Sequence, residues 1–232
     1  MIWNRLLSLL AATRRPLVFV DFVPAGQGGK PPVSYALAYW APWAPPETDA
    51  VSTSLRARCP PGLTYATHGL LNPECPIDLA TQQDHGISDA DVQGCRSYRD
   101  LEIAGLFRAL DAGDAAQNEG RAIWAGHNIA GGMPWMWEWG YLPDYHSAVP
   151  PASIDTIRLQ LRLTVDHPFP LLPDAYTSGV KAPCIGHGLK PYSWRLEGLH
   201  TALFGDPATG SPDDPTHAMA GISATVNCLA VM

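Results

Sequence analysis

The stretch Leu17-Val18-Phe19-Val20-Asp21-Phe22 is an apolar run of strand length, opened by Pro16 and followed by Pro24 and Gly26. Such a run, rich in β-branched and aromatic residues and bounded by turn formers, is typical of a buried strand. Asp21 is the one polar residue in the run and lies near its end. The sequence therefore predicts a central strand that ends in a carboxylate.

The segments that follow predict a sheet around this strand. Residues 33–43 and 51–58 favour two further strands, separated by a proline-rich turn at 42–46, which predicts an antiparallel meander of three strands. Residues 98–110 place apolar side chains at helical spacing. The short apolar run at 121–125 then predicts a parallel strand that returns to the sheet. Three antiparallel strands followed by parallel strands and helices indicate an α/β fold.

The rest of the chain predicts helices and loops. Helices are expected at 133–140, 153–163, 194–204 and 223–231, and loops at 143–151 and 168–190. The second loop is long enough to be a lid, an insertion or a contact surface. Residues 1–15 predict an N-terminal helical extension that packs on the body, and residues 16–232 predict a single domain.

Composition excludes several classes of protein. Hydrophobic residues make up 46% of the 232 residues and charged residues 16%, which excludes global disorder. The net charge of −7 disfavours extensive nucleic-acid binding but leaves room for a small local site. The five cysteines contain no Cys-x-x-Cys pair, and no apolar stretch approaches membrane-spanning length. We therefore expect a cytoplasmic protein without membrane contact.

Several separated segments together resemble the DnaQ-like (DEDDh) exonucleases of the ribonuclease H-like superfamily. They are Phe19 to Gly26, Leu71 to Ile77, His85 to Val92, Ala125 to Ile129, Ile154 to Thr156, Tyr192 to Leu199, and His217. The resemblance implies a ribonuclease H-like mixed sheet flanked by helices. It also implies 3′–5′ exonuclease chemistry, in which acidic side chains hold two divalent cations and a histidine takes a proton from the attacking water.

The sequence departs from this family pattern at the metal-binding positions. Asp21 matches the first carboxylate and His217 the general base, but Val23, Gly132 and Ile222 stand where the other acids are expected. A register slip of one residue would place Gly221 in the last of these positions. One carboxylate cannot hold two Mg²⁺ ions. The remaining candidate acids for such a site are Asp155, Asp213, Asp214 and Glu138.

Each remnant residue has a structural interpretation beside the functional one. Asp21 either binds a lone cation or accepts backbone hydrogen bonds at a strand end. His217 is either a relic base or a residue of a helix start or surface. The resemblance also indicates nucleic-acid contacts for Gly26, His85, Asn128 and Trp135. Alternatively, His85 belongs to an ordinary turn, and the tryptophans near Trp135 belong to the core or a partner interface.

These observations predict a pseudo-exonuclease rather than an enzyme, with no cofactor. Its expected role is that of a non-catalytic interaction subunit, or of a subunit that binds a nucleic-acid end, in a larger assembly. The expected partners are protein subunits of that assembly and a single-stranded 3′ end. The alternative is an active 3′–5′ exonuclease that uses Mg²⁺ or Mn²⁺ through rearranged ligands.

Overall fold

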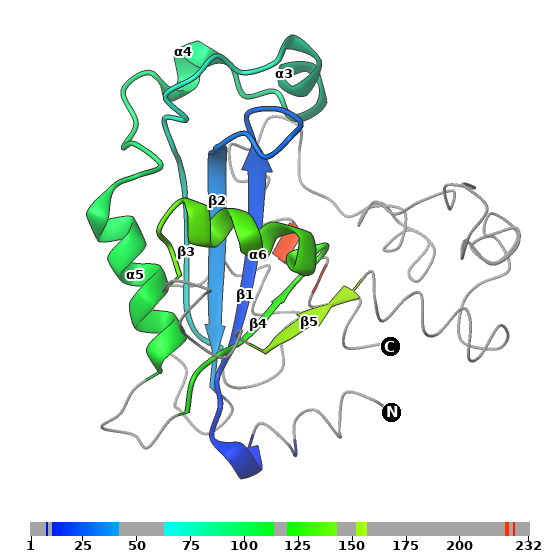
Figure 1. The fold of residues 1–232 in the computed structure, drawn as a ribbon, viewed down its shortest axis with the longest axis vertical. Coiled ribbons are helices and arrows are strands. Elements are labelled where there is room, and N and C mark those ends of the chain that lie inside the picture. Colours follow the sequence, from blue (N-terminus) through cyan, green and yellow to red (C-terminus); the bar gives the residue numbers. More distant parts are fainter. Residues whose placement is uncertain are drawn as a thin grey trace, which may run out of the picture.

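The computed structural model describes residues 8, 11–41, 63–113, 120–142, 152–156, 221, 222 and 225, and the account below concerns these residues. They form a five-stranded sheet in the order β3-β2-β1-β4-β5 (Figure 1). The strands are β1 (Leu17–Pro24), β2 (Pro32–Trp40), β3 (Leu63–Leu70), β4 (Ile123–Gly126) and β5 (Ser153–Asp155). The helices with defined bounds are α3 (Leu79–His85), α4 (Asp89–Val92), α5 (Leu101–Ala112) and α6 (Ile129–Glu138).

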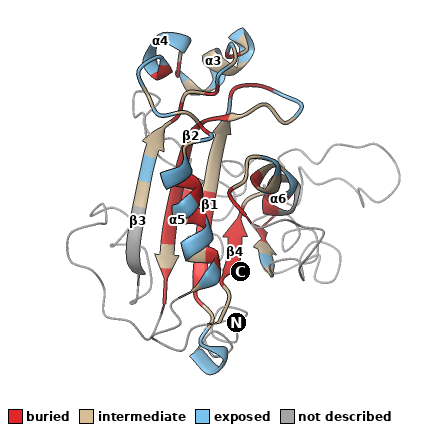
Figure 2. Ribbon diagram, turned by 60° about the vertical axis from the view of Figure 1, so that its left-hand side comes forward, coloured by how far each residue is buried: buried red, intermediate tan, exposed pale blue. Residues whose placement is uncertain are grey.

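The sheet is mixed, as the sequence predicts. β2 runs antiparallel to both β1 and β3, whereas β4 is parallel to β1 and β5 is parallel to β4. β1 therefore has a hydrogen-bonded strand on each side and its first half is fully buried (Figure 2). This double pairing explains why residues 17–22 form a nearly uninterrupted apolar run.

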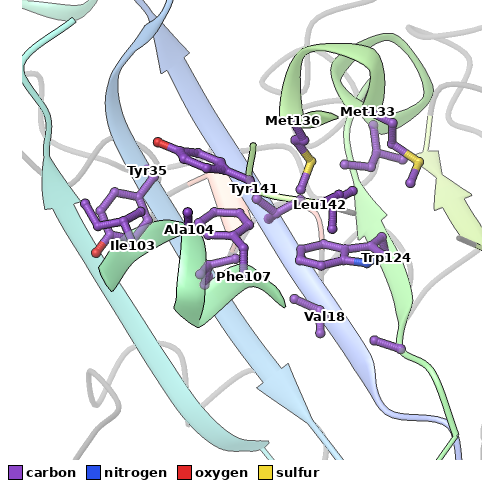
Figure 3. Packing of buried hydrophobic residues seen from close by; sticks show 14 of the residues in the cluster. Val18, Tyr35, Ile103, Ala104, Phe107, Trp124, Met133, Met136, Tyr141 and Leu142 are labelled. Carbon is purple, nitrogen blue, oxygen red and sulfur yellow. The ribbon is translucent and has the colours of Figure 1, made fainter. Parts of the chain in front are cut away.

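The main hydrophobic core lies between the sheet and the two longer helices, α5 and α6. The ring of Phe107 on α5 stacks on Tyr141 at 4.5 Å and on Trp124 of β4 at 5.9 Å between centroids (Figure 3). Met133 and Met136 of α6 are buried in the same cluster. The outer side of α5 is exposed, so this helix has the amphipathic character that its sequence spacing predicts (Figure 2).

The parallel pairing of β1 with β4 ends before β1 does. Their register runs from Leu17 opposite Ile123 to Phe19 opposite Ala125. β1 continues to Pro24, still paired with β2, while the chain after β4 turns into α6. The last residues of β1 therefore have an edge that faces α6 instead of a strand. Ligand sites of parallel sheets commonly lie at such carboxyl ends.

Several predicted elements are confirmed with small shifts of their ends. The strands predicted at 17–22, 33–43 and 121–125 correspond to β1, β2 and β4, and the helix predicted at 98–110 corresponds to α5. α5 begins after Asp100, whose side chain caps it by accepting from the N–H groups of Glu102 and Ile103. Ser8 and residues 11–13 are helical, and the other residues of the expected extension up to Leu10 lie outside the described part.

Three predictions need correction. Ser153–Asp155 is strand β5 and not the start of a helix over 153–163, because Ile154 lies in register with Ala125 of β4. α6 begins at Ile129, four residues before the predicted helix at 133–140. The strand that completes the meander is β3, which the sequence reading missed. The strand predicted at 51–58, the loops at 143–151 and 168–190, and the helix at 194–204 lie outside the described residues, and Thr225 is helical within the helix predicted at 223–231.

Within the described part of the chain, no helix combines the length and the apolar character that crossing a membrane requires.

A buried carboxylate joins α5 to the start of β4. Oδ2 of Asp111 accepts from Nε and Nη2 of Arg121 at 3.0 and 2.8 Å, and Oδ1 accepts from the indole N–H of Trp124 at 2.9 Å. The Asp111 side chain is 3% exposed and that of Arg121 is 36% exposed. A buried indole N–H needs such an acceptor, so this carboxylate fixes the helix on the strand.

We expect Asp111→Ala to lower the free energy of unfolding by about 3 kcal/mol, because it leaves a partly buried guanidinium and a buried indole N–H without their acceptor. Urea unfolding followed by tryptophan fluorescence measures the change. Glu102→Gln is the matched control, since it removes a carboxylate that pairs with Arg96 in the open, where both side chains are more than half exposed. The control should cost less than about 1 kcal/mol. Equal losses in the two variants would contradict the assignment.

Candidate functional site

A groove of about 290 Å³ lies between the end of β1, the turn that follows it and α6. It occupies the place where β1 runs past the end of its pairing with β4. The residues that line it are Val20, Asp21, Phe22, Pro24, Gly26, Gly29, Lys30, His127, Asn128, Ile129, Gly132, Trp135 and Trp139.

The turn between β1 and β2 forms one wall of this groove. Its ends are closed by a hydrogen bond from the Ala25 N–H to the carbonyl oxygen of Pro31 at 2.8 Å. Gly28 and Gly29 have φ values of +73° and +80°, which favour glycine. Gly29 also lies directly on the indole of Trp135, because a Cβ atom there would overlap the ring. The turn and α6 therefore meet through a glycine backbone and an aromatic face.

The start of α6 is fixed by contacts to the end of β5. Asn128 adopts a left-handed conformation with φ +59°, and its backbone N–H donates to Oδ1 of Asp155 at 3.1 Å. Nδ1 of His127 lies 2.8 Å from the hydroxyl of Thr156. Asp155 is 5% exposed and positions the helix start through this bond. Glu138, the other described acid considered for recruitment, is exposed and does not line the groove.

Lys30 supplies a positive charge to the groove wall. Its ammonium lies 2.5 Å from Oδ1 of Asp78 and 3.3 Å from the carbonyl oxygen of Pro76. The hydrogen bond to Asp78 raises the pKa of Lys30 above its usual value. Lys30 is therefore protonated at neutral pH. The lining residues that carry a full charge in the described part are Asp21 and Lys30.

The position that faces Asp21 in the last motif is Gly221. A Cβ atom on Gly221 would overlap Oδ2 of the Asp21 carboxylate. Ile222 is a buried core residue instead, with 1% of its surface exposed. Of the two registers that the sequence leaves open, the one that uses Gly221 places a residue in contact with Asp21. No side chain can enter the space in front of Asp21 from position 221 without moving that carboxylate.

Of the other two expected metal positions, Gly132 lines the groove together with Asp21 and Val23 does not. Val23 packs against an apolar cluster formed by Ala25, Val33, Ile77, Ile87 and Val92 and is not among the residues that line the groove. Gly132 does line the groove, with open space where a side chain would extend. Over the described residues, no group of three or more His, Cys, Asp or Glu side chains is placed to hold a metal ion. The described donor set therefore does not fit a pair of divalent cations.

The predicted nucleic-acid contacts divide into two groups. Gly26, Asn128 and Trp135 all line the groove. His85 ends α3 beside Gly86, where its Nδ1 accepts from the Ile87 N–H at 3.0 Å, and it is not a lining residue. His217 lies outside the described residues. Sequence reasoning missed Gly29 and Lys30, although the Gly28-Gly29-Lys30 run in the turn after the first strand was a visible signal.

Comparisons with known proteins give structural likeness only. No protein-family model matches the sequence, and no curated protein matches it. Among solved structures, E. coli exonuclease I bound to zinc and single-stranded DNA is 14% identical with a TM-score of 0.58, and the matched region covers 91% of this chain and 39% of that one. E. coli exonuclease I with a dT13 oligonucleotide is 15% identical, with a TM-score of 0.56 and coverage of 91% and 39%.

A third match, exonuclease I from Methylocaldum szegediense, is 15% identical with a TM-score of 0.54 and coverage of 93% and 40%. The chain therefore spans about two fifths of the length of these exonuclease structures. At this identity the likeness concerns the fold. The predicted α/β fold with a ribonuclease H-like mixed sheet is confirmed.

The close approach of Gly221 to Asp21 gives a prediction about packing. Gly221→Ala should lower the free energy of unfolding by about 1–3 kcal/mol, because the new Cβ must displace the carboxylate. The loss should shrink in an Asp21→Ala background, where the overlapping oxygen is gone. Urea unfolding of the four proteins of this double-mutant cycle measures the coupling.

The control for this cycle is Gly132→Ala. This residue lies within α6, and a Cβ atom added there would meet open space. It should leave stability unchanged or raise it by up to about 1 kcal/mol, because alanine is the better helix former. Additive losses for Gly221→Ala and Asp21→Ala would refute the contact between the two positions.

Proposed function

We propose that this chain binds the 3′ end of a single-stranded nucleic acid in the groove along α6 and does not hydrolyse it. One contrast carries the proposal. The groove keeps an aromatic wall, a glycine turn and a lysine, whereas Val23, Gly132 and Gly221 stand at the positions where the resemblance expects metal-binding acids.

The chemistry of hydrolysis supports the second half of the proposal. Two-metal cleavage of a phosphodiester needs cations about 3.5–4 Å apart, held by several carboxylate oxygens. Of the acids in the described residues, Asp21 lines the groove, and Asp155 holds the Asn128 N–H at the helix start. We therefore assign Asp21 a structural or electrostatic role and derive no hydrolytic step from it.

The chemistry of binding supports the first half. Trp135 and Trp139 line the groove, and Trp139 also packs against the main core. Exposed bases stack on aromatic rings whatever their sequence, so Trp135 is the stacking candidate of the two. Solved structures of E. coli exonuclease I contain single-stranded DNA or a dT13 oligonucleotide. The net charge of −7 limits phosphate contacts to a few, which suits an end rather than a long strand.

Binding without cutting leaves a nucleic-acid end protected. Such an activity suits a non-catalytic subunit of a larger assembly, in which protein partners contact the same chain. We propose this setting together with the site, and co-purification with the full chain is its test.

The direct test uses 5′-labelled oligo(dT) and oligo(U) with the full chain. We expect fluorescence anisotropy to show binding in EDTA, and denaturing gels to show no shortening with Mg²⁺ or Mn²⁺. Trp135→Ala should weaken binding by about 1–3 kcal/mol because it removes a stacking surface. Leu101→Ala is the control, since this side chain is 83% exposed on α5 and lies outside the groove lining.

Metal-dependent shortening that Asp21→Ala abolishes would overturn the proposal in favour of an active exonuclease with rearranged ligands. Equal binding by the Trp135→Ala and Leu101→Ala variants would place the ligand elsewhere on the chain.

A further inference from the structure

The ion pair between Lys30 and Asp78 lies at the rim of the groove. Lys30 lines the groove, but its ammonium is held by Oδ1 of Asp78 and by the carbonyl oxygen of Pro76. Both partners reach solvent, because the Lys30 side chain is 34% exposed and that of Asp78 is 45% exposed. Water and a dissolved ligand can therefore reach this pair.

Asp78 is itself fixed against the groove wall. Its backbone N–H donates to the carbonyl oxygen of Ala25 at 2.8 Å, which ties the segment before α3 to the end of β1. Its Oδ2 lies against Gly26, where a Cβ atom would overlap it. The Asp78 carboxylate thus contacts two residues of the groove lining, Gly26 and Lys30. It lies at the rim of the groove and forms an ion pair with the lysine there.

We infer that Lys30 is the group that binds a phosphate of the ligand in this groove, and that the carboxylate of Asp78 competes with that phosphate for the lysine. The inference rests on the proposed function and adds to it the anion-binding residue and its internal competitor. The ligand class is a phosphate of a nucleic-acid strand, bound without a metal ion.

The charges of the groove lining explain why binding of a phosphate needs Lys30. In the described part of the groove lining, Asp21 repels a phosphate and Lys30 attracts one. In the metal-free binding proposed here, a positive side chain offsets the phosphate charge, and a lysine ammonium is a common point-charge partner for phosphate.

The existing pair is weak enough to exchange. Ion pairs with both partners exposed to water contribute little, since solvent screens them. A phosphate brings one negative charge to the ammonium, as the carboxylate does, and adds the stacking of its base on the aromatic wall. The ligand can therefore displace Asp78 without a large rearrangement of the turn.

The test compares Asp78→Asn, Lys30→Met and the double variant with the wild-type chain. The measurement is anisotropy of 5′-labelled dT12 in EDTA across a series of NaCl concentrations. Asp78→Asn should tighten binding by up to about fivefold, because it removes the competing charge from an exposed pair. Lys30→Met should weaken binding and reduce the slope of log affinity against log salt by about 0.7, the value for one phosphate contact on a single strand.

The double variant decides whether Asp78 acts through Lys30. In the Lys30→Met background, Asp78→Asn should have no more effect than Glu102→Gln. This control removes the same unit of charge from an ion pair of the same 2.5 Å length, between residues that do not line the groove. Unchanged melting temperatures would show that the variants remain folded.

The outcomes separate this inference from the proposed function. The inference alone would be overturned if the wild-type chain binds and Trp135→Ala weakens that binding, but neither Lys30→Met nor Asp78→Asn changes the affinity. A gain from Asp78→Asn that persists without Lys30 would also overturn it, as a general effect of charge. No binding by the wild-type chain or by Asp78→Asn would overturn both.

Discussion

The unequal pairing of β1 with its two neighbours determines where this fold can act. β1 is hydrogen-bonded to β2 from Leu17 to Pro24, but its register with β4 ends at Phe19. β1 thus keeps its hydrogen bonds to β2 along its whole length, while the edge toward β4 is unpaired with that strand over the last residues. α6 passes across the opening that this leaves (Figure 1), and the groove forms between the two. Asp21 and the glycine turn occupy the opening because they follow the residues whose burial on both sides demands an apolar run.

Burial explains which elements the sequence predicts well. β1, β4 and α5 contribute to the main core, so the two strands read as short apolar runs and the helix has apolar residues at helical spacing. α6 breaks this rule, because its first turn contains Gly131 and Gly132, and Pro134 follows within the helix. These residues disfavour a helix by propensity, and burial of Ile129, Met133 and Met136 overrides it. β5 is three residues long, too short for any period to be read, and β3 lies at the edge of the sheet with His68 exposed.

The candidate site was predictable where a motif follows a strand directly. Gly26, Asn128 and Trp135 come after β1 or β4, and they line one groove. The described residues of the last motif, Gly221 and Ile222, are helical. Neighbouring residues of a helix point about 100° apart, so a slip of one residue exchanges a core position for a site position. Ile222 is buried and Gly221 faces Asp21 for this reason. The ion pair between Lys30 and Asp78 could not be predicted from the sequence, because it joins the turn after β1 to the segment before α3 across a long stretch of sequence.

The three positions where the resemblance expects an acid differ in the room that the structure leaves for one. At Gly132 the space beyond the backbone is open, so an aspartate would meet no obstacle there. At Val23, which is half-buried, an acid would lose the apolar contacts of a small cluster. At Gly221 the carboxylate of Asp21 already fills the place of a Cβ atom. An acid at 132 alone would leave the set without the partners from 23 and 221, and acids at those positions would require Asp21 and the cluster around Val23 to move. An acid at position 23 or 221 would therefore have to displace groups that already pack there, whereas position 132 is open.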